Sequence, residues 1–342
     1  MKDSKVTFRL IDFILLNIAI IAVIAVIVFT NVNNLHKESE ESGPSISKEV
    51  IQEDLKKEIE NRYYYNQLDE YGRKMYNTFL SNIDKFKAGD QYINIDINKE
   101  DAGDSFQSAW DAFSVDRPEY FFIDTNKLSL LTNVKTNIFN AKEYEYKIQP
   151  KNGETYFEKE FPTKEDVEFA STQLETVTKS IIDQANERAT RYDKVKFIHD
   201  FLVDNVAYSK DENEASADTI YGALINKVCV CEGYAKSFKY LLDKLEIPCI
   251  IVFGNGTNSE GKQEYHSWNY VKMDDDQWYA VDVTWDDPII VGGGKATTAI
   301  RYKYFLVGTE IDRNHTLESD ISGTGQNFKY PALSESNYSR KP

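Results

Sequence analysis

An amphipathic stretch that begins at Cys231 constrains the fold of this chain more than any other part of the sequence. Beyond the cysteine, apolar residues recur at helical spacing and form one stripe: Tyr234, Ala235, Phe238, Leu241, Leu242 and Leu245. Cys231 therefore stands at the N-terminus of a predicted helix. Unpaired backbone N–H groups and the helix dipole favour the negative charge of a thiolate there.

Two further residue types that a thiol enzyme needs follow Cys231 in the chain. His266 lies in a predicted strand over residues 265–272, and Asp282 lies in a second strand over residues 277–285, so the pair reads as a hairpin. A loop of three or five residues centred on Asp274 places His266 directly opposite Asp282, on the same face of the sheet. A slip of one residue turns Asp282 to the other face. A thiol, an imidazole and a carboxylate are the parts of a nucleophile–base–orienter relay.

These motifs resemble those of the bacterial transglutaminase-like superfamily. The similarity rests on Tyr221-Gly222-Ala223-Leu224, Val230-Cys231-Glu232-Gly233-Tyr234-Ala235, His266-Ser267-Trp268-Asn269 and Val281-Asp282-Val283-Thr284-Trp285-Asp286-Asp287. It is strong over about residues 190–290, and weaker similarity at 63–68 and 116–121 extends to membrane-anchored members. The resemblance implies an α+β, papain-like core in which a helix bearing the cysteine packs on an antiparallel sheet. It places a catalytic triad on Cys231, His266 and Asp282.

The chain has three cysteines and four histidines, which leaves few alternative site residues. Cys249 lies in an apolar run and is predicted to be a buried core residue. Cys229 is predicted to pack beside the site, but the sequence leaves open which of the two neighbouring thiols reacts, and a Cys229–Cys249 bridge is conceivable. His199 fits a helix-packing histidine, whereas His315, in a polar segment, is either structural or close to the site.

The spacing of these residues argues against a metal centre. Cys229-x-Cys231 is not the spacing of zinc ligands, no second cysteine pair follows, and His266 has no histidine three to five residues away. The sequence therefore predicts neither a metal nor another cofactor. A net charge of −16 also disfavours nucleic-acid binding, because phosphate groups require a basic surface.

An uncharged apolar segment near the N-terminus predicts a membrane anchor. Residues 13–30 are long enough to cross the hydrocarbon core of a bilayer as a helix. Basic residues within residues 1–12 predict that this end is cytoplasmic. A cleaved signal peptide is the alternative, but the apolar run is longer than its usual core and no clear cleavage site follows. We expect a single-pass protein of the cell membrane with an extracellular catalytic region.

Composition and periodicity divide the rest of the chain. Residues 31–47 are predicted to form a flexible tether, 48–165 an N-terminal α+β region, and 166–342 the catalytic domain with its core at about 190–290. Helices are predicted after an N-cap at Asp69, over 104–113, from a capping box at Thr163 to about 187, and over 190–205. Strands are predicted over 91–97, 120–123, 133–139 and 143–149.

The chemistry implied by the triad is acyl transfer on amide bonds through a cysteinyl thioester. An amine acceptor gives cross-linking of proteins or of the cell wall, and water gives a peptidase, amidase or deamidase. The residues alone do not choose between these acceptors. The expected substrates are amides of extracellular proteins or of peptidoglycan peptides. The alternative is a catalytically inactive transglutaminase-like scaffold or binding protein at the cell surface.

Overall fold

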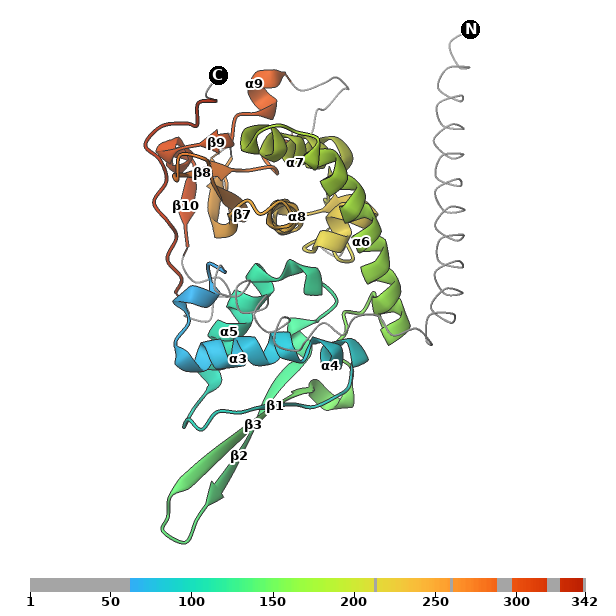
Figure 1. The fold of residues 1–342 in the computed structure, drawn as a ribbon, viewed down its shortest axis with the longest axis vertical. Coiled ribbons are helices and arrows are strands. Elements are labelled where there is room, and N and C mark those ends of the chain that lie inside the picture. Colours follow the sequence, from blue (N-terminus) through green and yellow to red (C-terminus); the bar gives the residue numbers. More distant parts are fainter. Residues whose placement is uncertain (1–61, 212–213, 259–260, 288–296, 319–326, 341–342) are drawn as a thin grey trace, which may run out of the picture. The chain divides into compact units, whose positions relative to one another are not determined.

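The computed structural model describes residues 62–340 except for 212–213, 259–260, 288–296 and 319–326 (Figure 1). The predicted anchor at 13–30 and the predicted tether at 31–47 lie outside these residues, and so does the N-terminal part of the region predicted at 48–165. Within the described part of the chain, no helix is both long enough and apolar enough to cross a membrane.

The first part of the described chain is a set of helices with a small antiparallel sheet of strand order β1-β3-β2. Helix α3 packs against α5 and β1. The elements of this part are η1 (Tyr65–Gln67), α3 (Glu70–Ser81), α4 (Ile83–Ala88), β1 (Ile93–Ile95), α5 (Gly103–Asp116), η2 (Pro118–Tyr120), η3 (Thr125–Lys127), β2 (Leu128–Thr136), β3 (Lys142–Pro150) and η4 (Lys151–Gly153).

The predicted N-cap of α3 is confirmed, because the Asp69 side chain accepts a hydrogen bond from the Gly72 backbone N–H at 2.6 Å. The helix predicted over 104–113 is α5, which is longer than predicted, and the strand predicted over 91–97 is the shorter β1. The two following strands are β2 and β3, but β2 begins at Leu128, before the predicted start.

The strand predicted over residues 120–123 is wrong. This segment is a 3-10 turn, η2, followed by a further turn, and only Ile123 makes an isolated bridge, to Phe157. The consecutive residues Phe121 and Phe122 are both buried, whereas a strand would direct them to opposite faces. Phe121 stacks on Tyr221, with ring centroids 5.3 Å apart, so burial in an aromatic cluster explains the aromatic composition of the segment.

The second part of the chain packs helices on a five-stranded sheet of strand order β10-β6-β7-β8-β9, and α8 lies against β6 and β7 (Figure 1). The elements are α6 (Lys164–Asn186), α7 (Arg191–Asn205), β4 (Ala207–Tyr208), η5 (Gly222–Asn226), β5 (Val228–Cys229), α8 (Cys231–Lys244), β6 (Cys249–Thr257), β7 (Gln263–Lys272), β8 (Trp278–Val281), α9 (Thr298–Arg301), β9 (Phe305–Val307), η6 (Thr309–Arg313) and β10 (His315–Leu317).

Helix α6 has its predicted cap, and α7 and α8 begin at or next to their predicted first residues. The Thr163 hydroxyl accepts from the Asp166 N–H, and the Asp166 carboxylate accepts from the Thr163 N–H, so the capping box of α6 is confirmed. Thr190 caps α7 in the same way through the N–H of Asp193. Helix α8 begins at Cys231, as the apolar periodicity predicts.

The hairpin of β7 and β8 is confirmed, but its predicted register is wrong by two residues. Lys272 pairs with Trp278, so the loop is centred on Asp275 rather than on Asp274, and His266 does not lie directly opposite Asp282. Because side chains alternate with a period of two, a shift of two residues keeps the side chains on the predicted face. Asp282 follows the last residue of β8.

Residues at the N-terminal end of the described chain form hydrogen bonds and an ion pair with the second part. Arg62 Nη1 lies 2.8 Å from the Asp243 carboxylate of α8, and the Tyr64 hydroxyl donates to the carbonyl oxygen of Ile251 in β6. Residues 59–342 form one compact unit. The boundary between regions at residues 165 and 166 therefore stays a prediction from sequence.

Candidate active site

Cys231 is the first residue of α8 and follows the short strand β5. The residue before it, Val230, has a side chain that cannot accept a hydrogen bond, so the first-turn N–H groups have no cap from that residue.

All three cysteines are free thiols. Cys229 and Cys249 are buried, and Cys231 is partly exposed. A Cys229–Cys249 bridge is thereby excluded, and Cys231 is the thiol that a substrate can reach.

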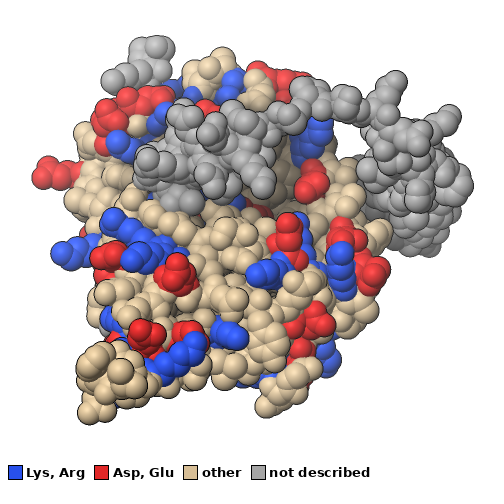
Figure 2. All heavy atoms as spheres, turned by 60° about the horizontal axis from the view of Figure 1, so that its bottom comes forward, with Lys and Arg blue, Asp and Glu red and all other residues tan. Residues whose placement is uncertain are grey.

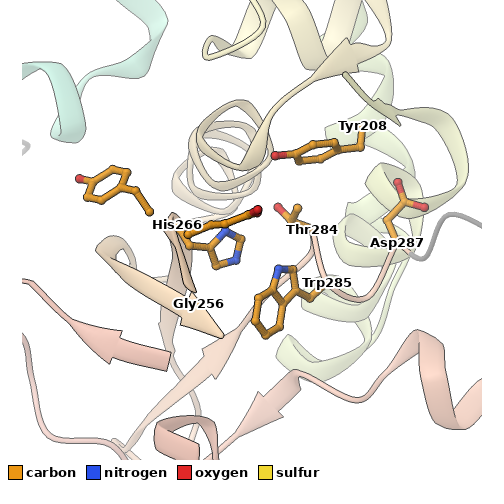
Figure 3. Close-up of a pocket in the computed structure, with 8 residues that line it drawn as sticks. Tyr208, Gly256, His266, Thr284, Trp285 and Asp287 are labelled. Atoms are coloured by element: carbon orange, nitrogen blue, oxygen red, sulfur yellow. The ribbon is translucent and has the colours of Figure 1, made fainter. Parts of the chain in front are cut away.

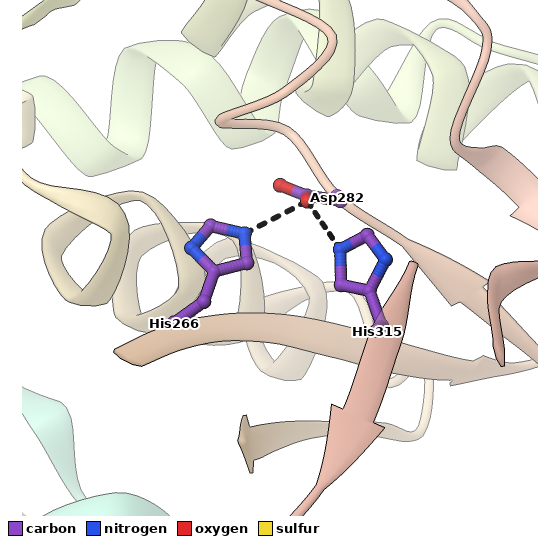
Figure 4. A group of neighbouring side chains, drawn as sticks. All are labelled: His266, Asp282 and His315. Carbon is purple, nitrogen blue, oxygen red and sulfur yellow. Dashed lines mark hydrogen bonds and ion pairs between the residues drawn. The ribbon is translucent and has the colours of Figure 1, made fainter. Parts of the chain in front are cut away.

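His266 and Asp282 meet at a buried hydrogen bond. The His266 Nε2 atom lies 2.8 Å from Asp282 Oδ2 (Figure 4), and the other carboxylate oxygen of Asp282 accepts from the Trp285 backbone N–H at 3.0 Å. Both side chains are almost completely buried. Strand β7 positions the imidazole, and the turn that follows β8 positions the carboxylate.

The ionisation of this pair follows from its contacts. Burial lowers the pKa of His266, but the Asp282 charge, its hydrogen bond and the interactions with Cys231 outweigh burial and raise the pKa to about 10. Burial raises the pKa of Asp282, but His266 and His315 outweigh it, and the pKa falls below its usual value. The arrangement therefore favours an imidazolium beside the Cys231 thiol.

His315 is the residue of the site that the sequence left unassigned. Its Nε2 atom lies 3.0 Å from Asp282 Oδ2, so one carboxylate oxygen accepts from two imidazoles (Figure 4). His315 begins β10, which pairs with β6 through Gly256, and its side chain is fully buried. A three-residue strand carries almost no periodicity, so the scarcity of histidine was the only signal for this role.

Within the described part of the chain, His266, Asp282 and His315 have the spacing of possible metal ligands. Their ligand atoms lie within 4.8 Å of one another. The two imidazole N–H groups already donate to the carboxylate, so the three side chains satisfy one another without an ion. The prediction that the site needs no metal stays a prediction.

Comparison with known families gives this geometry a context. Residues 176–283 match the family model of the transglutaminase-like superfamily. This segment is a transglutaminase-like domain. It includes Cys231, His266 and Asp282 and ends before His315. The α+β fold with its antiparallel sheet agrees with the sequence-based expectation for such a core.

Solved structures similar to the chain include a TGase, at 14% identity and a TM-score of 0.32, covering 74% of this chain and 62% of that one. A candidate cysteine protease from Cytophaga hutchinsonii is 14% identical, with a TM-score of 0.29 and coverages of 48% and 68%. A candidate protease from Parabacteroides distasonis is 12% identical, with a TM-score of 0.23 and coverages of 46% and 40%. The chain thus spans less than two thirds of the TGase. Comparison with curated proteins finds no match.

A pocket of about 230 Å³ opens beside His266 in the transglutaminase-like domain (Figure 3). Tyr208 and Trp285 lie on opposite sides of it, and Trp285 stacks on His266 with ring centroids 5.2 Å apart. Trp268, two residues from His266 in β7, is buried and does not line the pocket. The lining residues are Tyr208, Gly256, Glu264, Tyr265, His266, Thr284, Trp285 and Asp287.

Two glycines are required by close contacts around this site. A Cβ atom on Gly233, in the first turn of α8, would lie 2.4 Å from the Ala217 carbonyl oxygen and 2.6 Å from Cys229 Cβ. A Cβ atom on Gly256 would lie 2.6 Å from the Trp285 ring. Any side chain at Gly233 would therefore displace the helix start that carries Cys231.

A second buried group of ionisable residues lies next to the site. His199, on α7, has its Nε2 atom 3.2 Å from Asp286 Oδ2 and its Nδ1 atom 3.1 Å from Asp200 Oδ1. The Asp286 N–H donates to the carbonyl oxygen of Asp282 at 3.1 Å, so the second group shares backbone with the first. As the sequence predicts, His199 packs inside the domain.

Proposed function

We propose that this chain is a thiol enzyme that transfers acyl groups from amides, with Cys231 as nucleophile, His266 as proton carrier and Asp282 as its orienter. One observation carries the proposal. The Nε2 atom of His266 lies 2.8 Å from Asp282, and the pKa of the same imidazole is raised by interactions with the thiol that begins α8. These are the relationships that a nucleophile, a base and an orienting carboxylate require.

In the first half of the reaction, the Cys231 sulfur attacks the amide carbonyl carbon and forms a tetrahedral intermediate. The backbone N–H at the start of α8 supplies a hydrogen bond to the oxyanion. His266 donates its proton to the departing nitrogen as the C–N bond breaks, which releases ammonia or an amine. A thioester remains on Cys231. Asp282 holds the imidazole in place and stabilises its positive charge until the proton leaves.

In the second half, the acceptor loses a proton to His266 and attacks the thioester carbon, and the C–S bond breaks to return the thiolate. The charges of the pocket favour an amine as acceptor. Its lining includes the carboxyl groups of Glu264 and Asp287, and neither lysine nor arginine occurs among its described lining residues. A cationic amine is attracted by such a lining and gives one proton to solvent to become the neutral nucleophile, whereas a water molecule gains nothing comparable from the lining.

We place this chemistry on the outer surface of a cell membrane. The apolar segment at residues 13–30 supports the location, because it is long enough to span and follows basic residues. The substrates that fit this location are glutamine-containing extracellular proteins and peptidoglycan peptides, with a lysine or diaminopimelate amine as acceptor. Neither nucleic acid nor a cofactor takes part in the proposed reaction.

The test is incubation of the full chain, in detergent, with a glutamine-containing peptide and a tagged primary amine. We expect the tag to be incorporated with release of one ammonia per bond, without cleavage of the peptide backbone. Ammonia release without incorporation would make the protein a deamidase, and backbone cleavage would make it a peptidase. Either result would overturn the choice of acceptor.

Matched variants test the assignment of the nucleophile. Cys231→Ala should abolish all three reactions, and Cys229→Ala, two positions away, should keep most of the activity. Iodoacetamide at neutral pH should label one cysteine stoichiometrically in the wild-type chain and none in Cys231→Ala. A wild-type chain that is neither labelled nor active would instead be a scaffold.

A further inference from the structure

We propose that the tip of the β2–β3 hairpin inserts the side chains of Ile138 and Phe139 into the lipid surface of the membrane that carries the chain. The hairpin would thereby hold the transglutaminase-like domain against the bilayer at a second point. This proposal rests on the proposed membrane location but not on the proposed acyl-transfer chemistry.

The hairpin extends beyond the small sheet to which it belongs (Figure 1). Strand β1 pairs with β3 only at Tyr146–Ile148, so the outer half of the hairpin is a ribbon of two strands. At its tip, 91% of Ile138 and 83% of Phe139 are exposed, the two largest values among the exposed large apolar side chains of the described residues. Exposed apolar groups of this kind mark contact with a membrane or a partner.

The outer ribbon has two chemically different faces. Residues that pair across the strands share a face, so Val134 and Tyr144 lie together on one side. Lys135 pairs with Glu143 on the other side, next to Asn133 and Glu145. This face of the ribbon combines Val134 and the Tyr144 ring with the paired Thr136 and Lys142 next to the apolar tip, whereas the other face is mostly charged. Apolar groups flanked by a basic residue are typical of elements that lie partly in a bilayer interface.

The charge of the hairpin tip suits an anionic lipid surface. At the tip itself, residues 135–142 contain Lys135 and Lys142 and neither aspartate nor glutamate, whereas Glu143 and Glu145 follow in β3 and the whole chain has a net charge of −16. On the face of the protein that Figure 2 shows, basic and acidic groups are interspersed. The two lysines form exposed ion pairs with Glu145 and Glu100. Exposed pairs are weak, so both lysines can turn to lipid phosphates.

The turn holds its apolar residues in one orientation. The Asn137 side chain accepts from the Phe139 N–H at 2.9 Å and from the Ala141 N–H at 3.0 Å, and the Asn137 N–H donates to the Ala141 carbonyl oxygen. Asn140 has a φ of 62°, a left-handed conformation that asparagine tolerates well. The exposed pair is thus presented by a defined loop, which limits the entropy lost on insertion.

A lipid surface fits this tip better than a protein partner does. A specific protein interface buries more than about 1,000 Å² in total, which two side chains on a narrow ribbon cannot supply. A membrane contact needs less, because the proposed anchor makes it intramolecular. Residues 31–61 separate the anchor from the described chain and span at most about 110 Å. A connection of that length allows the tip to reach the bilayer and limits how far it can move away.

The experiment uses the full chain with Phe139→Trp, reconstituted into phosphatidylcholine vesicles that also contain phosphatidylglycerol. Flotation first shows that the chain is bound to the vesicles. The emission added by the new tryptophan, relative to wild type, should shift to shorter wavelength, be quenched by brominated lipids and be protected from acrylamide. Lysine contacts with lipid phosphate predict a smaller shift when phosphatidylglycerol is left out.

Phe169→Trp is the matched control, because Phe169 is 54% exposed on α6, away from the hairpin. Its emission should stay that of a water-exposed tryptophan. Adding Ile138→Asp to Phe139→Trp should reverse the lipid quenching. Equal emission and equal acrylamide access at positions 139 and 169, on vesicle-bound chain, would overturn the proposal, as would a shift at 139 that only an added protein or peptidoglycan produces. Amine incorporation in the same vesicles is scored separately, so loss of one property does not imply loss of the other.

Discussion

Two buried groups in the transglutaminase-like domain use the same residue types in opposite ratios. Around Asp282, one carboxylate oxygen accepts from the imidazoles of His266 and His315. Around His199, one imidazole lies between the carboxylates of Asp200 and Asp286. The pKa of Asp282 lies below its usual value, because two histidines outweigh burial. Burial outweighs the single histidine at Asp286 and raises the pKa to about 6.

The comparison shows how the proposed catalytic histidine differs from the structural one. Both nitrogens of His199 are engaged by carboxylates, and its ring is fully buried. His266 uses Nε2 for Asp282 and lines the pocket, which leaves its other nitrogen for the proposed proton transfer at Cys231. A histidine can carry a proton to a substrate only when one ring nitrogen remains available for it. The residue types alone do not distinguish the two groups.

The largest expected effect is a loss of stability on replacing His199, the imidazole between Asp200 and Asp286. His199→Leu removes the imidazole and leaves the carboxylates of Asp200 and Asp286 without it, one of them fully buried. The free energy of unfolding should fall by about 3–5 kcal/mol, the usual consequence of removing one partner of a buried ion pair. Chemical denaturation measures this loss. Activity per folded molecule should remain close to wild type, and a loss of activity in the folded variant would assign His199 to the chemistry.

The second effect is a loss of turnover that distinguishes the group around Asp282 from the group around His199. Asp282→Asn should lower turnover by a factor of about 10²–10³, because the amide no longer supports the imidazolium. Asp286→Asn, four residues later, should change turnover far less. Single-turnover amine incorporation measures both. Alkylation of Cys231 at pH 6 should also slow in Asp282→Asn and approach the wild-type rate at high pH. If turnover and the pH dependence of alkylation were the same in Asp282→Asn as in wild type, a residue other than Asp282 would orient His266.

The pair of His266 and Asp282 also predicts how the stability of the folded chain depends on pH. The pKa of His266 in the folded chain is about 10, above its ordinary value of 6.5. The stability that its protonated form contributes is therefore fully present below about pH 6.5 and is lost as the pH rises to about 10. Wild type and Asp282→Asn should differ most in unfolding free energy at the acidic end of this range. A difference that grows between pH 7 and 10 would contradict the assignment.

A smaller effect is expected at His315, which acts on the imidazole through Asp282 and is a positioning residue. His315→Phe removes one donor to the carboxylate and should lower turnover about tenfold. His315 helps to lower the pKa of Asp282, so the acidic limb of the pH–rate profile should move to higher pH in this variant. His315→Gln, whose amide can still donate, should restore most of the rate. An unchanged pH profile in His315→Phe would make the residue a packing group only.

The smallest effect is expected at Cys229. Burial raises the pKa of this thiol well above its usual value, so it does not compete as a thiolate. Cys229→Ala removes one buried sulfur beside Gly233 and should lower activity less than twofold, with a modest loss of stability. Thermal unfolding and the incorporation assay measure the two quantities. A large loss of activity at unchanged stability would move the nucleophile by two residues.

Much of this structure follows from local sequence. Helices α6 and α7 have polar caps and apolar stripes, which depend only on neighbouring residues, and they lie within a few residues of their predicted bounds. Helix α3 begins at its predicted cap but ends at Ser81, and a separate helix α4 follows, whereas the apolar periodicity predicts one helix up to Gly89. The hairpin that carries His266 and Asp282 and the helix start at Cys231 were predicted from local sequence. The packing of that helix on the sheet is a contact between distant segments, and it was expected from the resemblance to the transglutaminase-like superfamily. Local rules work where a feature depends on its immediate neighbours in the chain.

Three features were not predicted from sequence: one is the register of a hairpin, and the other two depend on distant contacts. The register of β7 on β8 was missed by two residues because several loop lengths fit the acidic run. Residues 120–123 have strand-like composition, but their aromatic rings pack on Tyr221 of another segment. The role of His315 depends on β10 pairing with β6, more than fifty residues earlier in the chain. Nothing near these residues in sequence reports such partners.

The position of β10 has a consequence for biosynthesis. A chain is made from its N-terminus, so Cys231, His266 and Asp282 are all synthesised before His315 and the edge strand that carries it. A nascent chain that stops after residue 283 contains the complete family-matched segment but lacks the second donor to Asp282. The site therefore acquires its final set of hydrogen bonds late, after most of the domain has been made. Under the proposed chemistry, the thiol would reach its full reactivity only after β10 has been made.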